Sequence, residues 1–208
     1  MTILKNFIVL EGLDGSGTTT QLRLLDGRLD RASTAHEATW EPTDGRIGSL
    51  IREVLRGEAQ ADPWSVALLF AADRCEHLRR AETGIVARAR GGQIVVSDRY
   101  VFSSLAYQSI NCGFERVFSL NRDFPLPQLL LFLDTPVAEC QRRLHGREIR
   151  EIYDDSPFQE KVRASYLECI AKFRDSGMHT VIVDGNRPVE EIHEDIWKEI
   201  EGLPKLSM

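Results

Sequence analysis

Short apolar runs alternate with helical periodicity along most of the chain. Four runs have the length and character of buried strands, at residues 7–10, 93–97, 129–133 and 180–183. The polar stretch 32–39 lies where a further strand is expected, but its pattern indicates one only weakly. Continuous apolar strands separated by helices are typical of a parallel sheet covered on both faces, so the pattern predicts an α/β fold. We expect one domain over residues 1–208, with about five parallel strands and helices on both faces.

Residues 7–21, FIVLEGLDGSGTTTQ, are the most informative stretch. An apolar run leads into a glycine-rich turn, and a helical pattern follows. This is the context of a phosphate-binding loop, in which backbone N–H groups and the start of a helix face an anion. The spacing Gly12-x4-Gly17-x-Thr19 fits the loop pattern, but Thr18 stands where the pattern has lysine. A strand-to-helix turn with only a structural role is the alternative interpretation.

The net charge of the chain limits the classes of molecule that it is expected to bind. The chain has 26 lysine and arginine residues against 32 acidic ones, which gives a net charge of −6. This balance argues against a general nucleic-acid binder, because such a protein needs a basic face. Only five of the cationic residues are lysines, and none of them lies in a glycine loop. If the chain binds phosphates, arginines must do so.

The cysteines and the hydropathy pattern indicate in which cellular compartment the protein is expected. The four cysteines are widely spaced and form no CxxC or Cys/His cluster, so we expect free thiols and no structural zinc. No apolar run approaches the roughly 18 residues of a membrane span, and the N-terminal run is too short for an export signal. We therefore expect a cytoplasmic protein with no membrane partner.

Polar residues follow the predicted strands. Ligands of parallel α/β sheets bind at the carboxyl ends of the strands. Asp98 and Arg99 follow the strand at 93–97, where Asp98 could hold a magnesium-bound water and Arg99 could clamp a phosphate with two N–H groups. A surface ion pair is the alternative for these two residues. Asp14, inside the glycine loop, would repel an anion unless it binds a metal, a sugar hydroxyl or an arginine.

A helix is predicted to begin at Asp62 and Pro63, with aspartate at the cap and proline in the first turn. Phe70 and Arg74 lie on this helix four residues apart, and therefore on one face. Together they could form a platform for a flat base with a guanidinium at its edge. The alternative places Phe70 in the core and Arg74 in solvent.

The segment 142–156 is dense in arginine. Its arginines are Arg142, Arg143, Arg147 and Arg150. A solvated, charged helix is one interpretation. In a phosphoryl transferase, such a segment would be a mobile lid that brings arginines onto the transferred group.

Taken together, six segments resemble the thymidylate kinase family of P-loop nucleoside monophosphate kinases. They are FIVLEGLDGSG, WEPTDGRIGSLIR, LLFAADR, SDRYVFSSLAYQ, LFLDTPVAECQRRL and VDGNRPVEEI. They span residues 7–192 in the family's order. The resemblance implies a P-loop NTPase-type fold with a short lid at about 142–156, and phosphorylation of dTMP by ATP with Mg²⁺. It also implies a homodimer.

The resemblance assigns roles residue by residue. The residues expected to bind ATP are Gly12, Gly15, Ser16, Gly17, Thr18, Thr19, Thr20, Arg143 and Arg187. Those expected to bind dTMP are Asp14, Phe70, Arg74, Arg99, Ser103, Ser104, Tyr107 and Gln108. Thr19 and Asp98 would hold the metal. The expected catalytic residues are Asp14, Asp98, Arg99, Arg147 and Arg150.

Two departures from the family pattern remove positive charge near the phosphates. Thr18 replaces the lysine of the loop, and Trp40 replaces the arginine of the family's REP motif. We hypothesise that Arg147 or Arg150 substitutes for the missing lysine. Two other functions stay open: a nucleotide-binding pseudokinase that has lost turnover, and a related kinase whose acceptor is dUMP or a deoxynucleoside.

Overall fold

The strands form a parallel sheet that confirms the predicted α/β class. The structure is a computed structural model, and it describes residues 1–145, 153 and 155–203. Within these residues the sheet has five strands in the order β2-β3-β1-β4-β5, and every pairing is parallel. The strands are β1 (Ile3–Gly12), β2 (His36–Trp40), β3 (Ile94–Asp98), β4 (Leu126–Asp134) and β5 (His179–Asp184).

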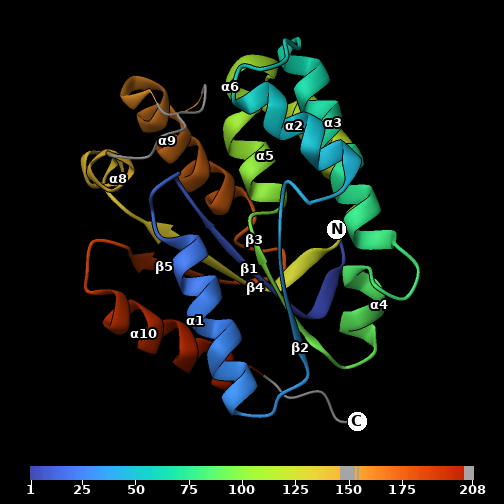
Figure 1. Ribbon diagram of the computed structural model, residues 1–208, viewed down its shortest axis with the longest axis vertical. Helices are drawn as coiled ribbons and strands as arrows, with labels where there is room; N and C mark the ends of the chain where they lie inside the picture. The colour runs from blue at the N-terminus through green and yellow to red at the C-terminus, as the bar shows by residue number, and fades with distance from the viewer. Residues whose placement is uncertain (146–152, 154, 204–208) are drawn as a thin grey trace.

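Helices cover both faces of the sheet (Figure 1). Alternate residues of β1 enter two different cores, because neighbouring side chains of a strand point to opposite faces. Phe7 and Val9 belong to one core, and Ile8 and Leu10 belong to the other. The helices are α1 (Thr18–Arg31), α2 (Arg46–Leu55), α3 (Pro63–Arg79), α4 (Ile85–Arg90), α5 (Val101–Tyr107), α6 (Ser109–Cys112), α7 (Phe114–Asn121), α8 (Val137–Leu144), α9 (Ser156–Lys172) and α10 (Val189–Glu201).

The weakly indicated strand exists and lies at the edge of the sheet. β2 pairs with β3 alone, and its residues are half-buried or exposed. This explains the polar sequence, because an edge strand has less apolar surface to bury. Trp40 is the last residue of β2, so this strand extends one residue beyond the polar stretch 32–39. Asp62 caps α3 as predicted, with its carboxylate 2.8 Å from Trp64 N.

The predicted lid falls largely outside the described residues. α8 ends at Leu144 and α9 begins at Ser156, while residues 146–152 and 154 are not described. Arg147 and Arg150 lie outside the described residues, so the roles expected for them from the sequence stay predictions. Among the described helices, none is long and apolar enough to cross a membrane.

Candidate active site

The glycine loop joins β1 to α1 and has the backbone geometry of an anion-binding turn. Gly15 and Gly17 have φ angles of 86° and 106°, in the left-handed region that favours glycine. The first N–H groups of α1 have no partner within the helix, so they can donate to an anion above the loop. A cavity of about 380 Å³ lies there, lined by the loop and by residues from the ends of β4 and α8.

Arg143 supplies positive charge beside the loop, where Thr18 contributes none. The Thr18 side chain is buried. Arg143 places its Nη1 3.1 Å from Ser16 O and its Nη2 3.0 Å from Gly185 O, while Nε donates to Glu139. Hydrogen bonds from Arg142 and Arg143 lower the pKa of Glu139 to about 2, so this carboxylate stays ionised and holds Arg143 in place.

Arg187 lines the same cavity from the segment after β5. Its Nη2 lies 2.7 Å from Asp195 Oδ2, on α10. Arg143 and Arg187, both expected near ATP, are thus brought to the glycine loop from segments far apart in the sequence. Contact of either with a nucleotide stays a prediction.

Thr19 and Asp98 form the candidate metal centre. The Thr19 hydroxyl donates to Asp98 Oδ2 across 2.7 Å, and the other carboxylate oxygen, Oδ1, is buried with no partner among the described residues. Hydroxyl and carboxylate oxygens suit Mg²⁺, which commonly binds through one or two carboxylates and substrate phosphates. The described part of the chain contains no group of three or more His, Cys, Asp or Glu residues able to hold a metal. The oxygen set therefore fits Mg²⁺ shared with a phosphate.

Arg99 connects the glycine loop with the other strand ends. Its Nη2 lies 2.5 Å from Asp14 Oδ1, and its Nη1 lies 2.9 Å from Gly12 O. Burial acts to lower the pKa of Arg99, but the Asp14 carboxylate raises it, and the net shift is well above the ordinary value. The guanidinium is therefore fully charged. Of the three partners considered for Asp14, a metal, a sugar hydroxyl or an arginine, the structure shows the arginine.

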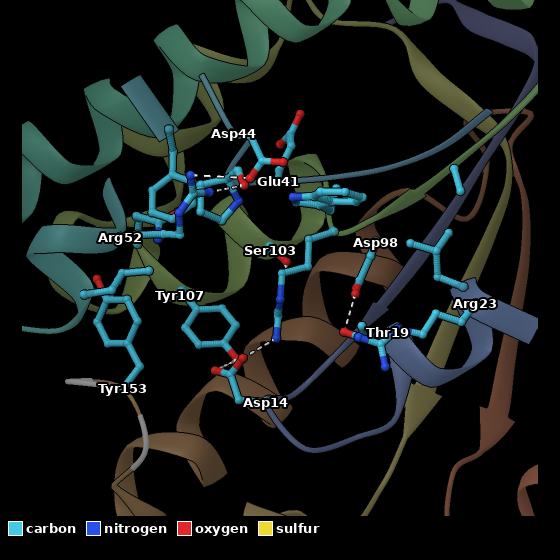
Figure 2. Close-up of a pocket in the computed structure, with 18 of the residues that line it drawn as sticks. Asp14, Thr19, Arg23, Glu41, Asp44, Arg52, Asp98, Ser103, Tyr107 and Tyr153 are labelled. Atoms are coloured by element: carbon cyan, nitrogen blue, oxygen red, sulfur yellow. Dashed lines mark hydrogen bonds and ion pairs between the residues drawn. The ribbon is translucent and has the colours of Figure 1, made fainter. Parts of the chain in front are cut away.

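A second cavity, of about 550 Å³, shares Asp14, Thr19 and Arg99 with the first. Figure 2 shows residues that line it. Phe70, Ser103, Tyr107 and Gln108, all expected at the acceptor site, line it. Figure 2 shows Tyr107 pointing toward Asp14, and the two oxygens are 3.0 Å apart. Burial and the Asp14 charge raise the pKa of Tyr107 well above its ordinary value, so the phenol remains a neutral donor.

Arg74 and Ser104 lie behind the cavity wall and not on it. The Arg74 side chain is 1% exposed, and its guanidinium donates to Glu41, Asn121, Tyr100 O and Ser104. Phe70 and Arg74 thus share a helix but point to different surroundings. The buried carboxylate of Glu41, 2.7 Å from Arg74 Nη2, draws the guanidinium inward. Direct contact of Arg74 or Ser104 with a base stays a prediction.

Several lining residues were not predicted from the sequence. They are Arg23, Asp26, Glu41, Asp44, Arg52 and Tyr153. Two of them, Arg23 and Glu41, could have been predicted from their positions in the sequence. Arg23 lies four residues after Thr19 on α1, and therefore on the same helix face. Glu41 directly follows β2, at the sheet edge where ligands of this fold class bind.

Comparisons with known proteins agree with this geometry. The family model described as thymidylate kinase matches residues 10–196. A relative from Treponema pallidum, named as a thymidylate kinase, is 42% identical over 100% of both chains. Another, from Aeropyrum pernix, is 41% identical over 93% of this chain and 92% of its own. The solved structure of thymidylate kinase from Candida albicans superposes with a TM-score of 0.78 at 26% identity, covering 95% of this chain and 91% of that one. The chain belongs to the thymidylate kinase family.

Proposed function

We propose that the protein transfers the γ-phosphoryl group of ATP to dTMP, forming ADP and dTDP, with Mg²⁺ as cofactor. The observation that carries this proposal is the meeting of two cavities. Asp14, Thr19 and Arg99 line both the cavity over the glycine loop and the larger one beside it. A phosphoryl group that passes from one nucleotide to another needs two adjacent sites with shared charged groups.

The donor nucleotide binds over the glycine loop in this proposal. Loop N–H groups and the start of α1 hold its phosphates, and Arg143 and Arg187 border the same cavity. Thr19 and Asp98 would hold Mg²⁺, which would supply positive charge to the donor phosphates. The acceptor binds in the larger cavity, with its base against Phe70 and its sugar beside Tyr107, which favours deoxyribose by crowding.

The chain's own residues supply positioning and charge. The second pKa of a phosphate monoester is about 6, so the attacking phosphate oxygen is largely ionised at neutral pH and needs no strong base. Arg99 lies between the two cavities as a permanent cation and neutralises the phosphates on either side. Asp14 holds that guanidinium in place through its 2.5 Å bond. Lid residues at about 142–156, including Arg147 and Arg150, close over the phosphates.

A coupled assay of ADP release over a panel of acceptors tests the proposal. The panel contains dTMP, dUMP, TMP with ribose, dCMP and deoxythymidine, each with Mg²⁺ and with excess EDTA. We expect turnover that is highest with dTMP and absent with EDTA. Binding of ATP and dTMP in calorimetry without turnover would identify a pseudokinase, for which the uncharged Thr18 is the favouring observation. A preference for dUMP or deoxythymidine would assign a related kinase.

From the family we also propose that the chain is a single kinase domain and that two copies form a homodimer. We further propose that the protein is cytoplasmic. Light scattering after size exclusion tests the assembly, because a dimer has twice the chain mass of 23.6 kDa. A mass of one chain at micromolar concentration would contradict this part of the proposal. Fractionation of source cells tests the compartment.

A further inference from the structure

Glu11 is a fully buried carboxylate that the proposed chemistry does not use. It lies at the second-last position of β1 and is 0% exposed. Its Oε1 accepts from Tyr100 N at 2.9 Å and from Ser103 N at 3.1 Å. Its Oε2 accepts from the Ser103 hydroxyl at 2.6 Å and from the Tyr166 hydroxyl at 2.9 Å. An ionised carboxylate has about four acceptor sites, so these four donors match it.

Three of these four donors lie in the short segment that follows Arg99. Arg99 itself has a φ angle of 70°, in the left-handed region that is unfavourable for a residue with a side chain. Such a conformation persists when surrounding contacts hold it in place. Here Leu10 O accepts from Arg99 N at 2.8 Å, and Glu11 accepts from the very next backbone N–H.

The same carboxylate also caps α5. Tyr100 is the residue before the helix, and its own side chain makes no capping bond. The first N–H groups of a helix need partners from outside the helix, and a negative charge there is favourable. Glu11, on β1, therefore provides the capping acceptor that the residue before α5 does not provide. The bonded set links the start of α5, the Arg99 turn and the strand that leads into the glycine loop.

We propose that Glu11 is a positioning residue that acts through Arg99. Its carboxylate holds the left-handed turn and the start of α5, and this keeps the Arg99 guanidinium on Gly12 O and Asp14, between the two cavities. The consequence for catalysis rests on the proposed phosphoryl transfer. The positioning itself is a property of the free protein, and it can be measured without any substrate.

The first test is amide hydrogen exchange of the free protein by NMR. Glu11→Gln keeps the size of the side chain but loses the negative charge, and Glu11→Ala removes all four bonds. We expect exchange at Tyr100 and Ser103 to become about tenfold faster in Glu11→Ala, with a smaller change in Glu11→Gln. Ile196→Val, a fully buried change in α10 on the opposite face, is the control. It should accelerate exchange in α10 and leave Tyr100 and Ser103 at wild-type rates. Wild-type rates at these two amides in both Glu11 variants would overturn the proposal.

The second test is a double-mutant cycle on kcat/KM for dTMP. We expect Glu11→Gln to lower this ratio by about tenfold to a hundredfold, because misplacing a group at the reacting centre has effects of this size. In an Arg99→Ala background, Glu11→Gln should cause no further loss, since it acts through the missing side chain. Losses that multiply in the double variant would overturn the proposal. If the wild-type protein does not phosphorylate dTMP, the proposed function fails, and the amide exchange alone decides the role of Glu11.

Discussion

The Thr19 hydroxyl donates to one oxygen of Asp98 across 2.7 Å, while the second oxygen of that carboxylate is buried without a partner among the described residues. A buried carboxylate oxygen with no donor is costly unless a cation or a water completes it. The pair therefore has the chemistry of a Mg²⁺ site that is completed by a nucleotide phosphate.

Asp98→Asn should weaken the response to Mg²⁺. The amide loses the negative charge at the end of β3, so we expect the Mg²⁺ concentration for half-maximal activity to rise about tenfold to a hundredfold. The measurement is a Mg²⁺ titration of turnover at fixed ATP and dTMP. Asp134→Asn is the control, because Asp134 also ends a strand, but its carboxylate is paired with Arg163 at 2.6 Å. Equal Mg²⁺ responses in the two variants would contradict the site.

Loss of a lid arginine should slow the chemical step. If Arg147 or Arg150 substitutes for the loop lysine, its replacement by alanine should lower the single-turnover rate by about 10³-fold or more, as removal of an arginine finger does. Thr18→Lys in the same background should recover part of the rate. Arg142→Ala is the control, since that side chain is 71% exposed and pairs with Glu139. Wild-type rates in both lid variants would end the substitution hypothesis.

Breaking the buried ion pair of Arg74 and Glu41 should destabilise the fold. Their side chains are 1% and 2% exposed, so Arg74→Met leaves Glu41 charged and without this partner in the interior. We expect a loss of about 3–5 kcal/mol in the free energy of unfolding, measured by urea denaturation. The pair of Arg187 and Asp195 is far more exposed. Asp195→Asn should therefore cost much less than Arg74→Met. A similar loss of unfolding free energy in both variants would show that burial does not determine how much an ion pair contributes to stability.

The Glu139 carboxylate should remain ionised at pH values where an ordinary glutamate is protonated. Its pKa lies at about 2, against an ordinary value of 4.5, because Arg142 and Arg143 donate to it. A carboxylate whose pKa is lowered in the folded state stabilises that state above pH 4.5 and loses this contribution as the pH falls toward 2. NMR titration of the Glu139 side-chain carbon measures the midpoint. Arg143→Ala should raise it while Arg163→Ala should not, and a wild-type midpoint near 4.5 would refute the pairing.

The sheet could be predicted from sequence where its strands are apolar, and this includes the edge strand β5, although Ile182 on it is 52% exposed. β1, β3 and β4 appear as continuous apolar runs because helices cover both of their faces. β2 was indicated only weakly, because an edge strand keeps polar residues and its position depends on pairing with β3, 58 residues away at His36 and Ile94.

Site residues on strand ends and in the glycine loop were predictable, and the directions of side chains on helices were not. Asp14, Thr19 and Arg99 follow from position, since a parallel sheet brings its carboxyl ends to one edge. Phe70 and Arg74 share a helix face, yet only the fold reveals that Glu41 lies close enough to bind Arg74 in the interior. Spacing along a helix gives a face, whereas the partner that a long side chain finds depends on distant segments.

β1 ends in three residues with three different tasks. Leu10 holds the backbone of Arg99, Glu11 holds the turn after it, and Gly12 accepts from its guanidinium and opens the glycine loop. Arg99 and the next residue, Tyr100, are therefore held beside the glycine loop by hydrogen bonds to three consecutive residues of one strand. We expect movements of the surrounding helices to leave these hydrogen bonds in place. β1 thus fixes the position of Arg99 relative to the glycine loop, and it is the fixed reference for movements of the other segments.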